Sequence, residues 1–201
     1  MDNAQELRCA RCDTKICREG ADCFGVGEDH RLLYDDPRVA RLHRAAAAIE
    51  ARHYGAEPRI REVILFAKEL GIRKLGLAFC VGLADEAAII EDIFSADFDV
   101  VSACCKVAGL SKASVGLEQI KPEASREVMC NPSGQADLLN DAGTELNVLC
   151  GLCVGHDAVF SMASKAPVTT LIVKDRVLAH NPIGAVYCQY IRRTMPTGES
   201  A

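Results

Sequence analysis

The sequence predicts an α/β fold: a three-layer domain with a mostly parallel sheet of four or five strands and helices on both faces, preceded by a small cysteine-rich metal knuckle. Three observations support this prediction. Short apolar runs alternate with helical patterns from residue 73 onward, which is typical of βαβ units. Four cysteines crowd into the first 30 residues, where apolar residues are few. Of the seven later cysteines, six form a second group, and most of these lie where a predicted strand ends.

Composition excludes several classes of protein. The chain is 49% apolar and 25% charged, as expected for one main globular core. Its net charge is −5 and its 23 basic residues are scattered, so no basic patch for nucleic acid is present. No apolar run approaches the roughly 20 residues of a membrane span, and the opening segment MDNAQELRCARC lacks the apolar core of a secretion signal. We therefore expect a cytoplasmic protein that binds neither nucleic acid nor membranes.

Residues 1–30 are predicted to form the knuckle, and residues 31–201 the α/β domain. In a cytoplasmic chain, cysteines at this density indicate metal ligands or redox thiols rather than disulfides. Four thiolates in one short segment can close around one ion, and ligation then supplies the folding energy. The C-x2-C half suits zinc or an iron–sulfur cluster, but the following x4 and x5 spacings differ from a zinc ribbon. The alternative is a flexible tail with incidental thiols. The predicted ligands are Cys9, Cys12, Cys17 and Cys23.

The first elements of the α/β domain are two helices, a strand, a helix and a second strand. An acidic residue and Pro37 start a helix over 37–53, and a second helix over 58–70 stops at Gly71. The strand over 74–80 is apolar on both faces, as a strand between two helix layers must be. A helix over 85–95 and a strand over 98–104 follow. The residues expected to face inward from that helix are Ile89, Ile90, Ile93 and Phe94.

Residues 106–131 show no clear period and are predicted to form a lid or binding loop, with a short helix over 123–129. The elements after this loop are better defined. Asn131 and Pro132 start a helix that ends at Gly143. A strand over 147–150, a helix over 155–165, a strand over 168–174 and a last helix over 182–193 follow. Cys188, inside that last helix, is predicted to be a core residue.

The second group of cysteines is expected at the carboxyl end of the sheet. Parallel strands joined by right-handed crossovers end on one side, where ligands collect. A single free cysteine often packs as a small apolar residue, so packing and a redox thiol pair remain alternatives. Five or six thiols in one place favour zinc, Cu(I) or an iron–sulfur cluster over magnesium or calcium. The predicted ligands are Cys80, Cys104, Cys105, Cys130, Cys150 and Cys153, with the choice between Cys104 and Cys105 left open.

Two histidines are candidates for binding a cofactor or ligand beside these thiols. His156 starts the helix after the third strand, where it either ligates, donates a hydrogen bond to a bound anion, or merely caps the helix. His180 follows the fourth strand, and the alternative is that it only shapes the turn before Pro182. The chain contains no G-x-G-x-x-G, G-x-x-x-x-G-K-[ST], G-x-S-x-G or H-E-x-x-H motif. Dinucleotide binding, a phosphate loop and the commonest hydrolase chemistries are therefore not indicated.

Four stretches of the sequence are similar to one protein family: CARCDTKIC, KLGLAFCVGLADEA, MCNPSGQADLLNDAGTELNVLCGLCVGHD and APVTTLIVKDRVLAHNP. The chain resembles a family of uncharacterised, cysteine-rich, predicted metal-binding proteins found mainly in anaerobic prokaryotes. The likeness covers nearly the whole chain. It implies metal binding without naming a reaction. The ligands that it implies are Cys9, Cys12, Cys17, Cys23, Cys80, Cys130, Cys150 and Cys153.

Three functions are compatible with these observations. We expect an iron–sulfur protein with two thiolate sites, used for electron transfer or redox chemistry, with a redox partner protein or a small anionic ligand as its partner. The first alternative is a metalloenzyme whose sheet-edge metal acts as a Lewis acid on a small anionic substrate. The second is a non-catalytic zinc-binding thiol protein. The identity of the metal and the oligomeric state stay open.

Overall fold

The computed structural model describes residues 7–196, and the chain divides into two compact units between Tyr54 and Gly55. Residues 1–6 of the predicted knuckle lie outside the described part. The domain boundary predicted after residue 30 stays a prediction. In residues 7–196 no helix is both long enough and apolar enough to cross a membrane.

The first unit consists of short turns followed by one long helix. The turns are the 3-10 helices η1 (Cys9–Arg11) and η2 (Ile16–Glu19), the α-helix α1 (Gly27–Leu32) and the 3-10 helix η3 (Leu33–Asp35). The helix α2 (Pro37–His53) confirms the predicted helix over 37–53. Its start is fixed by the Asp36 carboxylate, which accepts a hydrogen bond from the Arg38 N–H at 2.8 Å.

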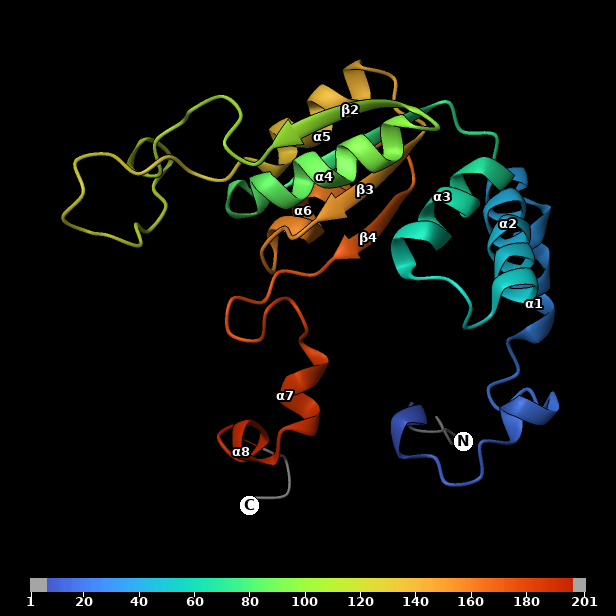
Figure 1. Ribbon diagram of the computed structural model, residues 1–201. Coiled ribbons are helices and arrows are strands. Elements are labelled where there is room, and N and C mark those ends of the chain that lie inside the picture. The colour runs from blue at the N-terminus through green and yellow to red at the C-terminus, as the bar shows by residue number, and fades with distance from the viewer. Residues whose placement is uncertain (1–6, 197–201) are drawn as a thin grey trace. The chain divides into compact units, whose positions relative to one another are not determined.

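The second unit contains a four-stranded, entirely parallel sheet, which confirms the predicted α/β class. The strands are β1 (Lys74–Phe79), β2 (Asp99–Cys104), β3 (Leu146–Cys150) and β4 (Val168–Ile172), arranged in the order β2-β1-β3-β4 (Figure 1). Each crossover carries a helix: α4 (Ala84–Ser95) joins β1 to β2, α5 (Pro132–Asp141) precedes β3, and α6 (His156–Ala163) precedes β4. Helix α3 (Arg59–Glu69) leads into β1.

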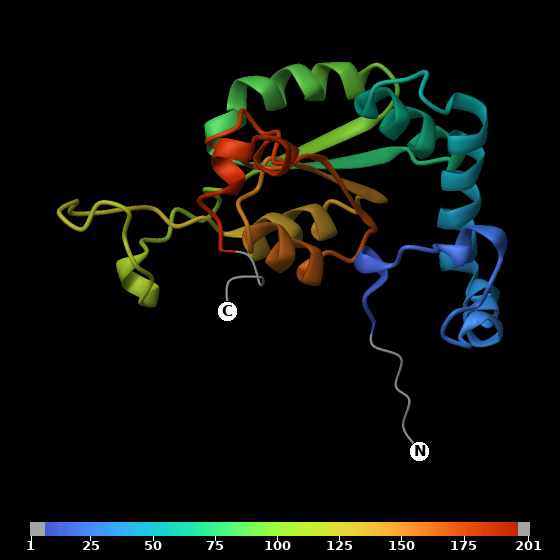
Figure 2. The same cartoon turned by 90° about the horizontal axis from the view of Figure 1, so that it is seen from below.

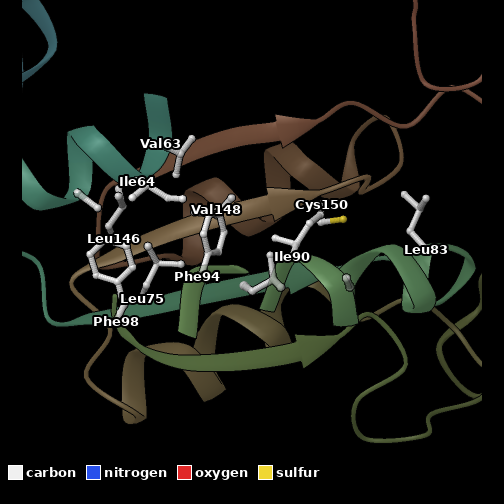
Figure 3. Close-up of a cluster of buried hydrophobic side chains, with 13 residues drawn as sticks. Val63, Ile64, Leu75, Leu83, Ile90, Phe94, Phe98, Leu146, Val148 and Cys150 are labelled. Atoms are coloured by element: carbon white, nitrogen blue, oxygen red, sulfur yellow. The ribbon is translucent and has the colours of Figure 1, made fainter. Parts of the chain in front are cut away.

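Helices cover both faces of this sheet, and each face has its own apolar core. Side chains of α3 and α4 pack on one face together with Leu75, Leu77 and Val148 (Figure 3). Side chains of α5 and α6 pack on the other face together with Ala78 and Leu149. Figure 2 shows α4 on one side of the strands and α5 and α6, in brown and orange, on the other. The alternation of faces follows from the two-residue period of a strand.

Two predictions about buried helix residues are wrong. Ile90 and Phe94 point into the core, but Ile89 and Ile93 are exposed, because only one stripe of α4 reaches the sheet. The predicted last helix is broken into α7 (Ile183–Tyr187) and α8 (Gln189–Arg192), and Cys188, at the break, is exposed. Neither short helix buries a residue, so no core is present there for Cys188 to join.

The loop over 106–131 extends away from the sheet in both overall views (Figures 1 and 2). Its two arms pair at the base through an antiparallel bridge between Ser111 and Val128. Lys112 and Glu127 form an ion pair of 2.7 Å beside that bridge. The short helix predicted over 123–129 is absent because this arm pairs with residues 110–112 instead, and the only helical turn here is η5 (Ala113–Val115).

Candidate functional site

The carboxyl end of the sheet brings cysteines from three strands together. The strand register places Cys104 on one side of Phe79 and Cys150 on the other. Beyond the strands, the Cys80 N–H donates to the Cys150 carbonyl at 3.1 Å, and the Cys105 N–H donates to the Phe79 carbonyl at 2.9 Å. Backbone hydrogen bonds therefore hold these cysteines at adjacent positions across β2, β1 and β3.

Cys80, Cys105 and Cys130, here called the sheet-edge thiols, share one buried cluster on the α5 face. Cys80 and Cys105 are 7% and 2% exposed. Cys130 is half-buried and reaches them because the Asn131 N–H donates to the Cys105 carbonyl at 2.8 Å, just before α5 begins. Half-buried Cys104 packs against the same cluster.

The Cys105 thiol is held in its neutral form. Burial is the largest cause that raises the pKa of this thiol to about 12, and the neighbouring Cys130 and Cys80 raise it further. The Val81 N–H, which donates to Cys105 Sγ at 3.3 Å, lowers the pKa. The pKa is therefore far above neutral pH, so binding of a metal ion at Cys105 requires the ion to displace the proton.

Cys150 lies on the opposite face of the sheet. It is completely buried in the core formed with α3 and α4, and Figure 3 shows it at the end of β3 beside Ile90. Burial, followed by the Glu86 carboxylate, raises the pKa of its thiol to about 11, while Lys174 acts in the opposite direction. Leu146, Val148 and Cys150 share this face because they alternate along the strand.

The turn after β3 is built around a glycine and closes on Cys153. Gly151 has φ +67°, and a Cβ atom there would collide with the Leu83 side chain. The N–H groups of His156 and Asp157 both donate to the Cys153 carbonyl, at 2.9 and 3.2 Å. Half-buried Cys153 accepts a hydrogen bond from Arg176 Nη2 at 3.0 Å. No sequence pattern predicts this contact of Arg176.

Cations surround this end of the sheet. Lys106 Nζ donates to the Val128 carbonyl at 2.7 Å and to Cys130 Sγ at 3.5 Å. Burial lowers the pKa of His156, and the charges of Lys106, Lys112 and Arg176 lower it further, against the effect of Asp157. At neutral pH His156 is therefore uncharged and free to accept or donate a hydrogen bond. Thiols and cations thus occupy one region.

His180 lies in a different place. Its Nδ1 atom accepts a hydrogen bond from the Asp175 N–H at 3.1 Å, and its backbone has φ +63°. It lines a groove of about 530 Å³ that runs beside β4, between Arg59 and Pro182. The structure therefore does not bring His180 together with the sheet-edge thiols.

A missed residue, Gln135 of α5, connects two of the strand ends. Its side chain is fully buried, and Nε2 donates to the carbonyls of Phe79 at 3.1 Å and Ala103 at 2.7 Å. Among the described residues, its Oε1 atom is the one buried side-chain nitrogen or oxygen without a hydrogen-bond partner. A glutamine in a helix is usually exposed, so no sequence pattern predicts that Gln135 is buried at the strand ends.

The four cysteines of the first unit line a single cavity. Its volume is about 360 Å³, and its other walls include Arg8, Lys15, Asp22 and Phe24. Cys12 Sγ accepts a hydrogen bond from the Lys15 N–H at 3.3 Å, and this contact, followed by that with Thr14, lowers the pKa of the thiol. The cysteines lining it are Cys9, Cys12, Cys17 and Cys23.

A carboxylate fixes the last cysteine of this group. Asp22 accepts hydrogen bonds from the N–H groups of Phe24, Val26 and Gly27, the shortest at 2.7 Å. These hydrogen bonds hold the turn over 22–27, which contains Cys23, in one conformation. As the side chains stand, no three His, Cys, Asp or Glu residues within 7–196 are close enough together to hold one metal ion.

Comparisons with known proteins find relatives without an assigned function. A family model described as a protein of unknown function (DUF1847) matches residues 23–171. An uncharacterised protein of Methanocaldococcus jannaschii is 42% identical over 194 residues, which cover 96% of this chain and 100% of that protein. No solved structure matches the chain.

Proposed function

The chain belongs to the DUF1847 family of proteins of unknown function, and we propose that it is an iron–sulfur protein with two thiolate sites, used in electron transfer or redox chemistry. The first site is the N-terminal knuckle and the second is formed by the sheet-edge thiols. The observation that supports this most is the single cavity lined by all four N-terminal cysteines. Four thiolates are the usual ligand set of a cluster.

Local structure at the knuckle suits a cluster. The Lys15 N–H already points at Cys12 Sγ, and hydrogen bonds to ligand sulfurs are one of the means by which proteins set the potential of a cluster. Ligation would draw the four sulfurs inward from the cavity wall. The short turns η1 and η2 have no buried residues that would resist such a movement.

At the sheet edge, the proposal is supported by the buried Cys80 and Cys105 of one cluster and by the half-buried Cys130 that packs against it. Cys153 extends this set from the turn after β3. Lys106 and Arg176, which donate to Cys130 and Cys153, would offset the negative charge of thiolates around a metal. Cys150 belongs to the opposite core, so we assign it to packing rather than to ligation.

The test is metal analysis of protein purified without oxygen. Iron, acid-labile sulfide and the visible spectrum are measured for the wild type and for Cys12→Ser, Cys105→Ser and Cys188→Ser. We expect a brown protein from which Cys12→Ser and Cys105→Ser each remove the iron of one site. Cys188 is exposed and outside both groups, so Cys188→Ser is the matched control and should keep all of the iron. A colourless wild type that contains zinc instead would support the non-catalytic zinc protein and overturn this proposal.

The cations favour one second candidate, a metalloenzyme that acts on a small anionic substrate. Lys106 and Arg176 both contact thiols, and in the described part of the chain neither forms an ion pair with a carboxylate. Their charges also lower the pKa of His156. His156→Ala should then weaken binding of inorganic phosphate or a small carboxylate while the metal content stays the same. Equal anion affinity in the two proteins would reject this candidate.

A further inference from the structure

Gln135 joins the two strand ends that carry Cys80 and Cys105. Its amide group donates to the carbonyls of Phe79 and Ala103, which directly precede Cys80 and Cys104 in the chain. The Phe79 carbonyl also accepts the Cys105 N–H. The side chain of one helix residue therefore bridges β1 and β2 where the thiols begin.

The remaining atom of this amide is unexplained by packing. Gln135 Oε1 is buried and has no partner among the described residues, although nearly all buried polar groups in proteins have one. A methionine or leucine would fill the same space without leaving an unpaired acceptor. The oxygen belongs to the same amide group as Nε2, so it lies beside the strand ends that hold the thiols.

The backbone N–H groups of the thiol segments already have other acceptors. The Cys80 N–H donates to the Cys150 carbonyl, the Cys105 N–H to the Phe79 carbonyl, and the Val81 N–H to Cys105 Sγ. The candidate donors to Gln135 Oε1 that belong to the site are a thiol S–H, a bound water and a ligand that carries a proton.

We propose that Gln135 is a positioning residue of the sheet-edge site, which holds Cys80 and Cys105 side by side through its amide NH2 and accepts a hydrogen bond from the site through Oε1. This inference rests on the proposed function, since it assigns a supporting residue to the second thiolate site. Partners of metal ligands commonly alter metal affinity by about 10-fold to 100-fold when they are removed.

The experiment uses the full chain with all four N-terminal cysteines replaced by serine, so that added cobalt(II) reports only on the sheet edge. Gln135→Met is compared with Asn147→Leu. Asn147 is also a fully buried amide, but it lies near the start of β3, and both of its polar atoms are paired, with Thr144 and Ser164. Both variants should lower the melting temperature, which makes Asn147→Leu a control for general destabilisation.

Two readouts separate positioning from stability. Gln135→Met should weaken the affinity for cobalt(II) by about tenfold or more. In metal-free protein it should also speed alkylation of Cys105 by iodoacetamide, measured by mass spectrometry. Asn147→Leu should change neither. Equal effects of the two variants, or wild-type values for Gln135→Met, would overturn the inference. If the parent chain, which carries only the four N-terminal serine substitutions, binds no cobalt, the second thiolate site of the proposed function is rejected. The alkylation rates still decide the role of Gln135.

A measurement on the unsubstituted side chain covers the case in which Gln135→Met does not fold. The side-chain amide signals of Gln135 and Asn147 are followed by NMR while zinc(II) is added to the parent chain, and the same spectra are recorded between pH 6 and pH 8 without metal. The Gln135 signals should show slow solvent exchange and should shift with zinc, while those of Asn147 stay in place. Rapid exchange of the Gln135 amide protons, or equal shifts at both residues, would contradict the proposal.

Discussion

Cys150 and Cys105 are both buried thiols at strand ends, but the sheet separates them. Cys105 faces two other cysteines, whereas Cys150 belongs to the apolar core that includes Leu83 and Ile90 (Figure 3). A buried thiol with apolar neighbours behaves as a small hydrophobic residue. Its effect on the protein should therefore appear in stability and its pH dependence.

The pKa of Cys150 predicts a loss of stability in alkali. The folded chain keeps this proton up to about pH 11, while the unfolded chain loses it near the ordinary value of 9.0. The stabilising contribution is complete below pH 9 and is lost as the pH rises towards 11. In metal-free protein, Cys150→Ala should therefore make the free energy of unfolding less steep against pH in this range, by up to about 1.4 kcal/mol per pH unit. Urea unfolding at a series of pH values measures this, and an unchanged slope would contradict it.

Gly151 should be irreplaceable for two separate reasons. Its positive φ disfavours any other residue, and a Cβ would collide with Leu83. Gly143 has a similar φ of +70° but open space around it, so it isolates the backbone effect. We expect Gly143→Ala to cost roughly 1–2 kcal/mol and Gly151→Ala roughly 1–3 kcal/mol more. Chemical denaturation of the two variants checks this, and equal costs would mean that Leu83 moves aside freely.

Strand alternation explains which site residues the sequence predicts and which it does not. The prediction that Cys80, Cys104, Cys105 and Cys150 lie at strand ends is confirmed. Cys150 continues the buried series of Leu146 and Val148 along its strand, so the two-residue period of a strand places it on the other face from Cys80. Gln135 and Arg176 carry no such pattern. Their contacts arise from segments far apart in the chain: Gln135 and Ala103 are 32 positions apart, and Arg176 and Cys153 are 23 positions apart.

At the scale of elements, the loop over 106–131 depends on its base. The Lys112–Glu127 pair is 16% and 19% exposed at its side chains, and Glu127 also accepts the Ile120 N–H at 2.7 Å. The Lys112 contact is the largest cause that lowers the pKa of Glu127 below its ordinary value of 4.5. The stabilisation is thus present above about pH 4.5 and is lost as the pH falls through the lowered pKa.

Glu127→Gln should therefore loosen the loop base at neutral pH, because it removes the ion pair with Lys112. Protonation of Glu127 in acid should have the same effect in the wild type. Hydrogen exchange of the Met129 and Lys112 amides, which donate to Leu110 and Glu127 carbonyls across the base, measures this opening. Amides in β1 and β3 serve as internal controls and should exchange at their wild-type rates. Unchanged protection at the base would show that the backbone bridge suffices without the ion pair.

Most elements are predictable because their signals are local. Caps, prolines and apolar periodicity locate α2, α5 and all four strands to within one or two residues. The break at Cys188 and the pairing of the loop arms depend on contacts that no local pattern records. An apolar stripe over 182–193 predicts a helix, but nothing buries that stripe in the described structure, and α7 and α8 stay short.

At the scale of the molecule, the two units should respond separately to loss of metal. The apolar core of the second unit is built from its own helices and strands. Replacing all four N-terminal cysteines by serine should therefore leave the thermal unfolding transition of this unit unchanged. Circular dichroism during heating, with Cys188→Ser as control, tests this. Loss of the transition would mean that the knuckle is required for folding of the sheet.

In the proposed function, one chain carries two separate thiolate sites for iron–sulfur clusters. Native mass spectrometry of protein purified without oxygen tests this most directly, since it weighs the bound iron and sulfide on the intact chain. We expect two mass increments from bound clusters: one is lost in Cys12→Ser, the other is lost in Cys105→Ser, and both are kept in Cys188→Ser. A wild-type chain at its bare polypeptide mass, or a single increment that disappears in both cysteine variants, would contradict it.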